Sequence, residues 1–333
     1  MKRLLALREK AKKEIRKIVL PEGEDERVLR AASYMAKEKI TDVTVLGKED
    51  DIRGMAKKLS IDLGGVALLD PATDPAREEI IDLYFKLRER KGVTREDAEK
   101  LLMGNFVFYG AMMARLGRAD GFVSGASHTT ADVARASIQC LSLDREIGTV
   151  CSSFVIELED SPFGENGLFI YADCGIIPYP NSRQLAGIAI ATSDLFNKLF
   201  DVEPRVALLS FSTKGSAEGE SVDLVRAALG KVKEKRPSML VDGELQLDAA
   251  IVPSVAEKKC KGSPVAGKAN VLIFPSLDAG NIAYKLTERL AGAKAIGPII
   301  QGMDKPCSDL SRGCSWDDVV DAAVVTAVRM QGK

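Results

Sequence analysis

The chain carries its densest set of chemically useful residues close to its C-terminus. The segment from Asp309 to Ser315 (DLSRGCS) supplies a hydroxyl, a guanidinium and a glycine directly before a stretch with helical periodicity. Unpaired N–H groups and the dipole at a helix N-terminus favour negative charge, so this segment predicts a phosphate-binding site. Asp318 lies three residues after Ser315, and its structural alternative is the acidic partner of a capping box.

Two further loops offer similar groups after strand-like runs. The segment from Ser124 to Thr130 (SGASHTT) follows Gly121-Phe122-Val123, and the segment from Ser210 to Ser216 (SFSTKGS) follows an apolar run at 205–209. Their hydroxyls, glycines and one lysine suit an anion. Capping of the next helix by Thr129 or Thr130, or an ordinary polar connection, explains these loops equally well. His128, the one histidine of the chain, is on its own more typical of a hydrogen-bonded structural residue.

The nucleotide-binding motifs are excluded by the order of the elements. Residues 262–269 (GSPVAGKA) come close to a Walker A loop, but they precede the strand-like run at Val271 instead of following a strand. No GxGxxG follows a strand either. The sequence therefore predicts neither an ATP loop nor a dinucleotide fingerprint.

Composition narrows the class of protein. The 47 basic residues nearly cancel the 48 acidic ones, so we expect no nucleic-acid partner. No apolar run approaches the roughly 18 residues of a membrane span, and the N-terminal run is too short for a signal peptide, which favours a cytoplasmic protein without a membrane partner. Six scattered cysteines without a CxxC, and a single histidine, predict idle buried thiols and no metal site.

The elements that must position these residues alternate along the chain. Helical spacing at 28–36 precedes a strand-like run at 43–46, and helices at 221–235 and 279–290 follow strand-like runs at 205–209 and 271–275. The tail from Ser315 onward has one apolar stripe, which predicts a packed terminal helix. Alternation of this kind predicts an α/β fold with mostly parallel sheets, and a length of 333 residues favours two domains.

Five blocks in order resemble the phosphate acetyltransferase (phosphotransacetylase) family, within the phosphate acetyl/butyryltransferases, from about Leu20 to the C-terminus. These blocks are SGASHTTADVARASIQ (124–139), SFSTKGSA (210–217), DGELQLDAAIVP (242–253), GSPVAGKANVLIFPSLDAGNIAYK (262–285) and KPCSDLSRGCS (305–315). The resemblance implies two α/β/α domains with an interdomain cleft, an isocitrate dehydrogenase-like architecture and a homodimer. It places residues 1–143 with 297–333 in a discontinuous first domain and residues 144–296 in the second.

The resemblance also implies roles for particular residues. The family's catalytic serine, arginine and aspartate match Ser311, Arg312 and Asp318, and its coenzyme A arginines match Arg88 and Arg135. We assign the acyl phosphate to Arg312 together with Ser127, Thr130, Tyr284 and Lys285; Arg289 is a further basic family position. The implied reaction is direct attack of the coenzyme A thiolate on acetyl phosphate in a ternary complex, with coenzyme A as substrate, no permanently bound cofactor and no metal.

The sequence departs from the family pattern at a few positions. Ser276, Asp278 and Ser308 stand where the family more often has Asp, Asn and Asn, and Ala136 replaces a common proline. A carboxylate at Asp278 removes donors near an anionic substrate, so the acyl preference is open between acetyl, propionyl and butyryl. A non-catalytic regulatory domain of the same fold is the remaining alternative, and the intact SRG segment favours an enzyme.

Overall fold

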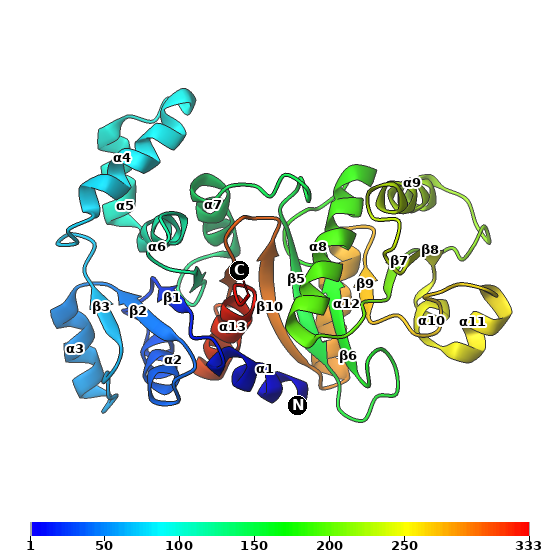
Figure 1. Cartoon of the computed structure of the whole chain (residues 1–333), viewed down its shortest axis with the longest axis horizontal. Helices are drawn as coiled ribbons and strands as arrows, with labels where there is room; N and C mark the ends of the chain where they lie inside the picture. Colours follow the sequence, from blue (N-terminus) through cyan, green and yellow to red (C-terminus); the bar gives the residue numbers. More distant parts are fainter. Residues whose placement is uncertain (1, 333) are drawn as a thin grey trace. The chain divides into compact units, whose positions relative to one another are not determined.

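The computed structural model describes residues 2–332 and divides into two compact units (Figure 1). We call residues 5–142 with those from 303 onward the terminal unit, and residues 143–302 with those before 5 the central unit. The expected crossing at 143 lies at the limit of a unit, whereas the expected return at 297 falls inside strand β10 (Lys294–Gln301) of the central unit. That the two units behave as domains, with a cleft between them, stays a prediction.

The terminal unit is built on a parallel sheet. Its elements are α1 (Lys2–Lys12, from Leu5 onward), β1 (Lys17–Leu20), α2 (Glu26–Lys37), β2 (Asp42–Leu46), α3 (Glu49–Lys58), β3 (Ala67–Leu69), α4 (Arg77–Arg88), the 3₁₀ turn η1 (Glu89–Lys91), α5 (Arg95–Gly104), α6 (Phe106–Arg115), β4 (Gly121–Ser124), α7 (Thr130–Cys140), β11 (Cys307–Asp309) and α13 (Trp316–Val328). The strand order is β3-β2-β1-β4-β11, and every neighbouring pair is parallel. The carboxyl ends of β1, β4 and β11 therefore meet at one edge, where ligands of such sheets bind.

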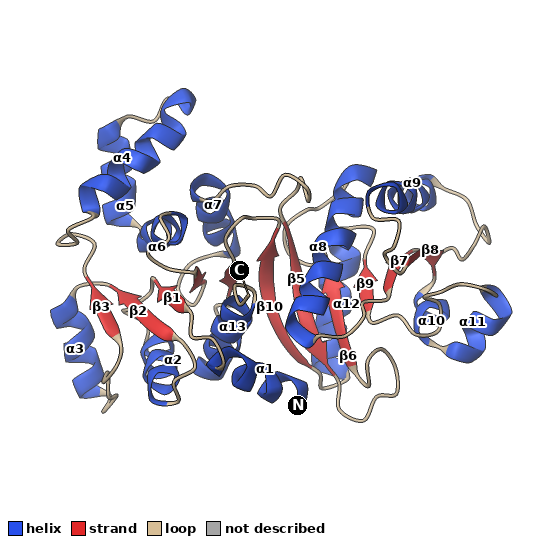
Figure 2. Cartoon of the chain, in the orientation of Figure 1, coloured by secondary structure: helices blue, strands red, loops and turns tan. Residues whose placement is uncertain are grey.

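Helices cover both faces of this sheet, so its central strands β1, β4 and β11 are buried except for Lys17 at the start of β1. Helices α2, α3 and α13 lie on one face, and α6 and α7 lie on the other (Figure 2). Helix α13 packs on β1, β4 and β11, and every residue from Val319 to Val328 is buried. The predicted terminal helix is thus confirmed, and its packing fixes the position of its N-terminus at the edge of the sheet.

The central unit holds a mixed sheet. Its elements are β5 (Cys151–Glu157), β6 (Leu168–Ala172), α8 (Ser182–Phe200), β7 (Val206–Leu209), α9 (Glu220–Lys235), β8 (Val241–Leu245), α10 (Leu247–Ile251), α11 (Pro253–Lys259), β9 (Val271–Ile273), α12 (Leu277–Leu290) and β10. The order is β10-β5-β6-β9-β7-β8, in which β5 pairs antiparallel with both β10 and β6 while the other pairs are parallel. Alternate residues of these strands, among them Phe154, Tyr171 and Leu272, form one core with α10 and α12.

The structure confirms the predicted α/β class and its mostly parallel pairing. The strand-like runs at 43–46, 205–209 and 271–275 correspond to β2, β7 and β9, and the helices predicted at 28–36, 221–235 and 279–290 correspond to α2, α9 and α12. All six cysteines are free and buried, as predicted. Residues 262–269 form a connection that leads into β9, which agrees with the rejection of a Walker A loop.

Candidate active site

The segment from Leu310 to Ser315 forms an exposed loop at the N-terminus of α13. Ser311 and Arg312 are exposed, while Cys314 is buried. The loop is a tight turn, because the Cys314 N–H donates to the Ser311 carbonyl over 2.8 Å and the Gly313 N–H donates to Ser311 Oγ over 3.3 Å. A guanidinium and a hydroxyl therefore stand in solvent at the positive end of a helix.

Asp318 closes the first turn of α13 as a capping box. Its Oδ2 accepts from the Ser315 N–H and from Ser315 Oγ, both over 2.9 Å, and the Asp318 N–H donates to Ser315 Oγ over 3.2 Å. The structural alternative for Asp318 is thus present in the fold. A role as a base has to be compatible with this cap, and it stays a prediction.

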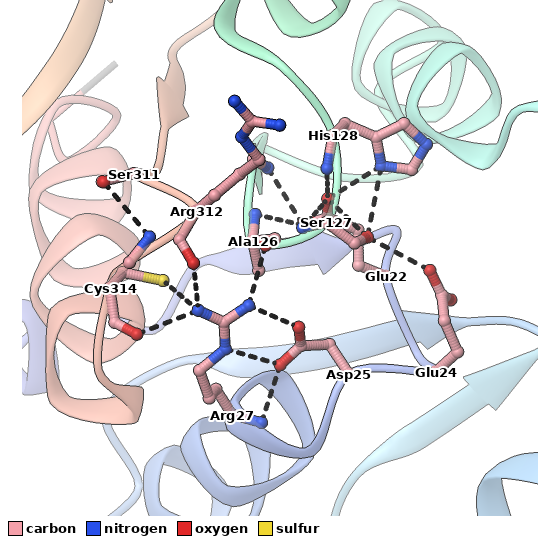
Figure 3. A network of polar contacts seen from close by, with 12 residues as sticks. Glu22, Glu24, Asp25, Arg27, Ala126, Ser127, His128, Ser311, Arg312 and Cys314 are labelled. Carbon is pink, nitrogen blue, oxygen red and sulfur yellow. Dashed lines mark hydrogen bonds and ion pairs between the residues drawn. The ribbon is translucent and has the colours of Figure 1, made fainter.

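Arg27 joins this loop to the one that follows β4, a link that the sequence did not reveal. One terminal nitrogen, Nη1, donates to the carbonyls of Arg312 (2.7 Å) and Cys314 (3.0 Å), and the other, Nη2, donates to the Ala126 carbonyl (2.7 Å) (Figure 3). The Asp25 carboxylate, which also caps α2, fixes this guanidinium. The two loops predicted to bind anions are therefore neighbours, held together by one arginine.

The Glu22 side chain binds the backbone N–H groups of the loop after β4. Its carboxylate accepts the N–H groups of four successive residues over 2.9–3.0 Å and lies 2.8 Å from His128 Nδ1 (Figure 3); these residues are Gly125, Ala126, Ser127 and His128. Burial alone would raise the pKa of Glu22, but the hydrogen bonds from His128 and the loop lower it to about 2. The hydrogen bond to Glu22 also raises the pKa of His128, although its partial burial acts to lower it. The amides of this loop thus bind a carboxylate of the chain itself. His128 is hydrogen-bonded to the same carboxylate, which is the structural role expected for a lone histidine.

The hydroxyls of this loop have different surroundings. Ser127 Oγ lies 3.1 Å from Glu22 Oε1 and 3.2 Å from Glu24 Oε1, so Glu22 holds it too. Thr129, and not Thr130, is the N-cap of α7, in a capping box with Asp132. Thr130 is the first residue of α7 and half buried. The assignment of Ser127 and Thr130 to the acyl phosphate stays a prediction, and the geometry favours Thr130.

The loop after β7 repeats this arrangement in the central unit. The Glu244 carboxylate accepts from Ser212 Oγ (3.0 Å) and the Gly215 N–H (2.8 Å) and pairs with Arg226, while Lys214 forms an ion pair with Asp242. These contacts, together with burial that opposes them, set the pKa of Glu244 at about 2. Internal carboxylates thus occupy the Ser212 hydroxyl, the Gly215 N–H and Lys214, which supports the polar-connection alternative for residues 210–216.

The two predicted coenzyme A arginines lie on neighbouring helices. Arg88 is the last residue of α4, Arg135 lies on α7, and these helices pack on each other. Tyr84, one turn before Arg88, donates to Gln139, one turn after Arg135, over 2.7 Å. Arg135 is exposed and pairs with Asp132 of its own helix, whereas the buried Arg88 Nε has no partner among the described residues. The fold thus brings both guanidinium groups to one pair of helices.

Tyr284 and Lys285 belong to α12 of the central unit. Lys285 Nζ lies 2.6 Å from Asn281 Oδ1, 3.0 Å from the Tyr284 hydroxyl and 4.4 Å from the centre of the Tyr284 ring. The Tyr284 ring stacks on Phe154 at 3.9 Å. This packing orients both side chains, and their part in binding acyl phosphate stays a prediction.

Asp309 is a further acid of this region, besides Asp318, and no role was predicted for it from the sequence. It closes β11 directly before Leu310, with none of its surface exposed. Burial raises the pKa of its carboxyl to about 7, although the Thr130 hydroxyl and the Leu310 N–H act in the opposite direction. The signal available in the sequence was an acidic residue at the end of a strand, immediately before the SRG triplet.

Residues 2–332 hold neither a cluster of metal-ligating side chains nor a helix that could span a membrane. No group of three or more His, Cys, Asp and Glu side chains in that range is placed to hold a metal ion. No helix in it is long and apolar enough to span a membrane.

Comparisons with known proteins point to one family. Residues 4–327 match the family described as phosphate acetyl/butaryl transferase. Curated relatives named phosphate acetyltransferase include one from Thermoanaerobacterium thermosaccharolyticum, 49% identical over 97% of this chain and 98% of its own, and one from Acetivibrio thermocellus, 47% identical over 97% and 96%. A phosphotransacetylase structure from Streptococcus pyogenes superposes with a TM-score of 0.92 at 39% identity over 98% of both chains.

Proposed function

Because this chain belongs to the phosphate acetyl/butaryl transferase family, it is an acyltransferase that interconverts acetyl-CoA and phosphate with coenzyme A and acetyl phosphate, and we propose that the loop before α13 carries the reaction. The observation that supports this location most is the exposure of Ser311 and Arg312 at the N-terminus of a buried helix. The comparisons bear on the activity, and the roles of single residues remain our proposal.

In the proposed step, the coenzyme A thiolate attacks the carbonyl carbon of acetyl phosphate. A C–S bond forms, the bond from carbon to the bridging oxygen breaks, and phosphate leaves with that electron pair. Ser311 donates a hydrogen bond to the tetrahedral oxyanion, and Arg312 neutralises the departing phosphate. Arg27 holds the carbonyls of residues 312 and 314 and so limits the freedom of this loop.

We propose that Asp318 receives the thiol proton. An ordinary aspartate and thiol differ in pKa by about 4.6 units, roughly 6 kcal/mol, so the aspartate alone is a weak base for this step. One oxygen of Asp318 is already occupied by the Ser315 cap. Arg312 near the bound thiol would narrow the difference by favouring the thiolate.

We further propose that Arg88 and Arg135 hold the phosphate groups of coenzyme A. Their helices are fixed to each other by the Tyr84–Gln139 hydrogen bond, so the two guanidinium groups keep a constant relation. A planar guanidinium donates to two phosphate oxygens at once, which suits this ligand.

The test is a kinetic comparison of three arginine variants, with thioester formation from acetyl phosphate and coenzyme A followed by ultraviolet absorbance. Arg312→Gln should lower kcat/KM for acetyl phosphate by about 10²–10³, because charge stabilisation in the transition state is lost. Arg88→Gln should mainly raise the KM for coenzyme A, because it removes binding common to ground and transition states. Arg53→Gln, on the exposed surface of α3, is the matched control and should behave as wild type. Wild-type turnover in Arg312→Gln would refute the proposed location.

Acyl preference is a separate proposal. We propose acetyl phosphate over propionyl and butyryl phosphate as the preferred substrate, in accord with the names of the curated relatives. A single methylene in an apolar pocket discriminates by only ~1–3 kcal/mol, so the longer substrates should react measurably. The ratios of kcat/KM for the three acyl phosphates measure this preference.

We also propose a homodimer in the cytoplasm. Helix α12 exposes Ile282, Leu286 and Leu290, which lie four residues apart on one side of the helix and are each more than half exposed. A contiguous apolar row of this kind fits a second copy of the chain better than solvent. The six free, buried thiols suit a reducing compartment.

A further inference from the structure

Two buried polar side chains lie next to each other beneath the candidate site, and neither makes a hydrogen bond of good geometry with a described residue. Asp309, at the end of β11, is the parallel register partner of Ser124, at the end of β4. Paired residues of neighbouring strands point to the same face of a sheet, so the carboxyl and the hydroxyl are neighbours. Both residues are 0% exposed, and Asp309 Oδ1, Asp309 Oδ2 and Ser124 Oγ have no partner of good geometry among the described residues. Folded proteins rarely leave such groups unpaired without a functional reason.

The Asp309 carboxyl lies directly behind both loops of the site. Gly125 has a φ of +116°, and a Cβ placed on it would lie 2.3 Å from Asp309 Oδ1 and 2.6 Å from the Leu310 nitrogen. The backbone of the loop after β4 therefore rests on the Asp309 carboxyl. Along the chain, the same carboxyl precedes Ser311 by two residues. A negative charge on this carboxyl would therefore act on both loops.

Within residues 2–332, the charged group that acts on Asp309 is the negative Glu22. The segment after β1 contributes Glu22, β4 contributes Ser124, α7 contributes Thr130, and the chain itself contributes the Leu310 N–H. On the opposite face of β11, Ser308 bonds with Thr326 of α13 over 2.8 Å, so that helix adds a neutral pair. Glu22 is ionised and satisfied by four amides, whereas Asp309 has neither a cation nor a set of amides to stabilise an ionised form. The pKa values of two buried acids on either side of one loop are thus shifted in opposite directions, that of Glu22 downward and that of Asp309 upward.

We propose that Asp309 is a positioning residue that must carry its proton while an anionic substrate is bound, and that its ionisation weakens binding of the acyl phosphate or phosphate at Ser311 and Arg312. This inference rests on the proposed function for the location of the anion. The protonated carboxyl adds no charge behind the loops and offers one donor to Ser124 or Thr130. Ionisation releases that proton to solvent and places a negative charge behind the phosphate seat, where attraction by Arg312 is partly cancelled.

The first test measures sulfate binding by calorimetry, because sulfate stays a dianion across the range used. Coenzyme A is present throughout, so that Arg88 and Arg135 are occupied. The sulfate Kd of the wild type should rise at least about fivefold between pH 6 and pH 8.5, since one like charge is added near the ligand. Asp309→Asn, which stays neutral with nearly the same shape, should show a smaller rise than the wild type, and the rise that remains comes from other groups such as His128. Asp304→Asn, an exposed acid five residues earlier whose Oδ1 accepts from the Ser142 N–H, is the matched control and should keep the wild-type rise.

A second test needs no substitution at Asp309, in case Asp309→Asn does not fold. Carbon-13 NMR of side-chain-labelled aspartate should show one carboxyl that titrates near neutral pH, and saturating sulfate should raise its midpoint. This follows because a ligand that prefers the protonated form must tighten proton binding by the same factor. Asp194 is another aspartate with a raised pKa, and the loss of its signal in Asp194→Asn distinguishes it from Asp309.

The outcomes separate this inference from the proposed function. A sulfate Kd that is the same at both pH values, an equal rise in Asp309→Asn, or a titration midpoint that sulfate does not move would each overturn the inference. If the wild type still transferred acetyl groups, the proposed function would stand. Absence of acyl transfer at every pH would instead overturn the proposed function.

Discussion

At the scale of single residues, several acids of this protein hold the chain together, and we propose a chemical role for one of them, Asp318. Glu22 and Asp25 are committed to the chain, because their oxygens accept from loop amides, from His128 and from Arg27. The Asp318 carboxylate caps α13 through one oxygen, and it is also the proposed base. Variants at Asp318 and Ser315 test whether the two roles can be separated.

We expect Asp318→Asn to lower turnover by a factor of at least ~100, because general-base help is lost while the amide oxygen still caps the helix. Ser315→Ala is the matched variant, since it removes the cap and keeps the carboxylate; it should cost about 1 kcal/mol of stability and little turnover. Turnover by acyl-transfer assay and stability by denaturant titration decide. If Asp318→Asn retained turnover but lost stability, the capping role alone would account for the residue.

A second residue-scale prediction concerns Glu22 and acid. Its pKa falls from 4.5 to about 2 on folding, so it contributes stability above pH 4.5 that is lost as pH falls towards 2. The shift corresponds to about 3 kcal/mol. Glu22→Gln should therefore lose about that much stability at pH 7 and show a weaker dependence on pH below 4.5, as measured by urea unfolding. Glu24→Gln, an exposed neighbour, is the control; a loss of equal size there would contradict the pairing argument.

At the scale of elements, three connections after strands share one device. A buried carboxylate accepts from the loop in each case. Glu22 accepts four successive N–H groups after β4, and Asp173 accepts three in the turn after β6. Glu244 accepts the Gly215 N–H and the Ser212 hydroxyl after β7. Glycine and hydroxyl residues in such loops therefore indicate an anion nest, but here the anion belongs to the chain. The loop before α13 differs, because its arginine and serine project into solvent and its carbonyls are held by Arg27.

The close approach of the loop after β4 to β11 gives an element-scale prediction. Gly125→Ala would place a methyl group 2.3 Å from Asp309 Oδ1 at a φ of +116°, so we expect a loss of roughly 2 kcal/mol or more, together with lower activity. Gly54→Ala in the exposed helix α3, where an added Cβ meets nothing within 4 Å, should instead gain up to about 1 kcal/mol. Thermal unfolding measures both. A neutral Gly125→Ala would show that the loop can move away from Asp309.

At the scale of the whole molecule, two compact units are built from different parts of the chain. The terminal unit takes its last strand and helix from beyond residue 302, so α13 and the loop before it join a sheet whose other strands end by Ser124. Ser311 and Arg312 consequently reach the edge of the sheet where Glu22 and Ser124 lie, although about 190 residues separate them from Ser124 in sequence.

The proposed dimer is tested at this scale. Leu286→Glu places a charge in the exposed apolar row of α12, so it should shift the assembly towards the monomer in light scattering coupled to size-exclusion chromatography. Leu247→Glu, at an exposed leucine of α10, is the matched control and should leave the mass unchanged. A monomeric wild type, or a dimer that persists in Leu286→Glu, would refute α12 as the interface.

The sequence by itself determined the fold class, the family and the position of the candidate loop. Periodicity located α2, α9, α12 and the strands beside them, because local apolar patterning depends on near neighbours in the chain. The SRG triplet before a helix predicted an anion-binding loop for the same reason, since capping and the helix dipole are local properties. The structure shows that Ser311 and Arg312 of this loop are exposed.

Only the tertiary structure decided which donors in the other loops were already occupied. Glu22 lies more than 100 residues from the amides it accepts, and Arg27 lies more than 280 from the carbonyl of Arg312, so no local pattern reveals either contact. The state of Asp309 was equally hidden, because burial and the neighbouring charge of Glu22, which raise the pKa of its carboxyl, arise only when β1, β4 and β11 come side by side.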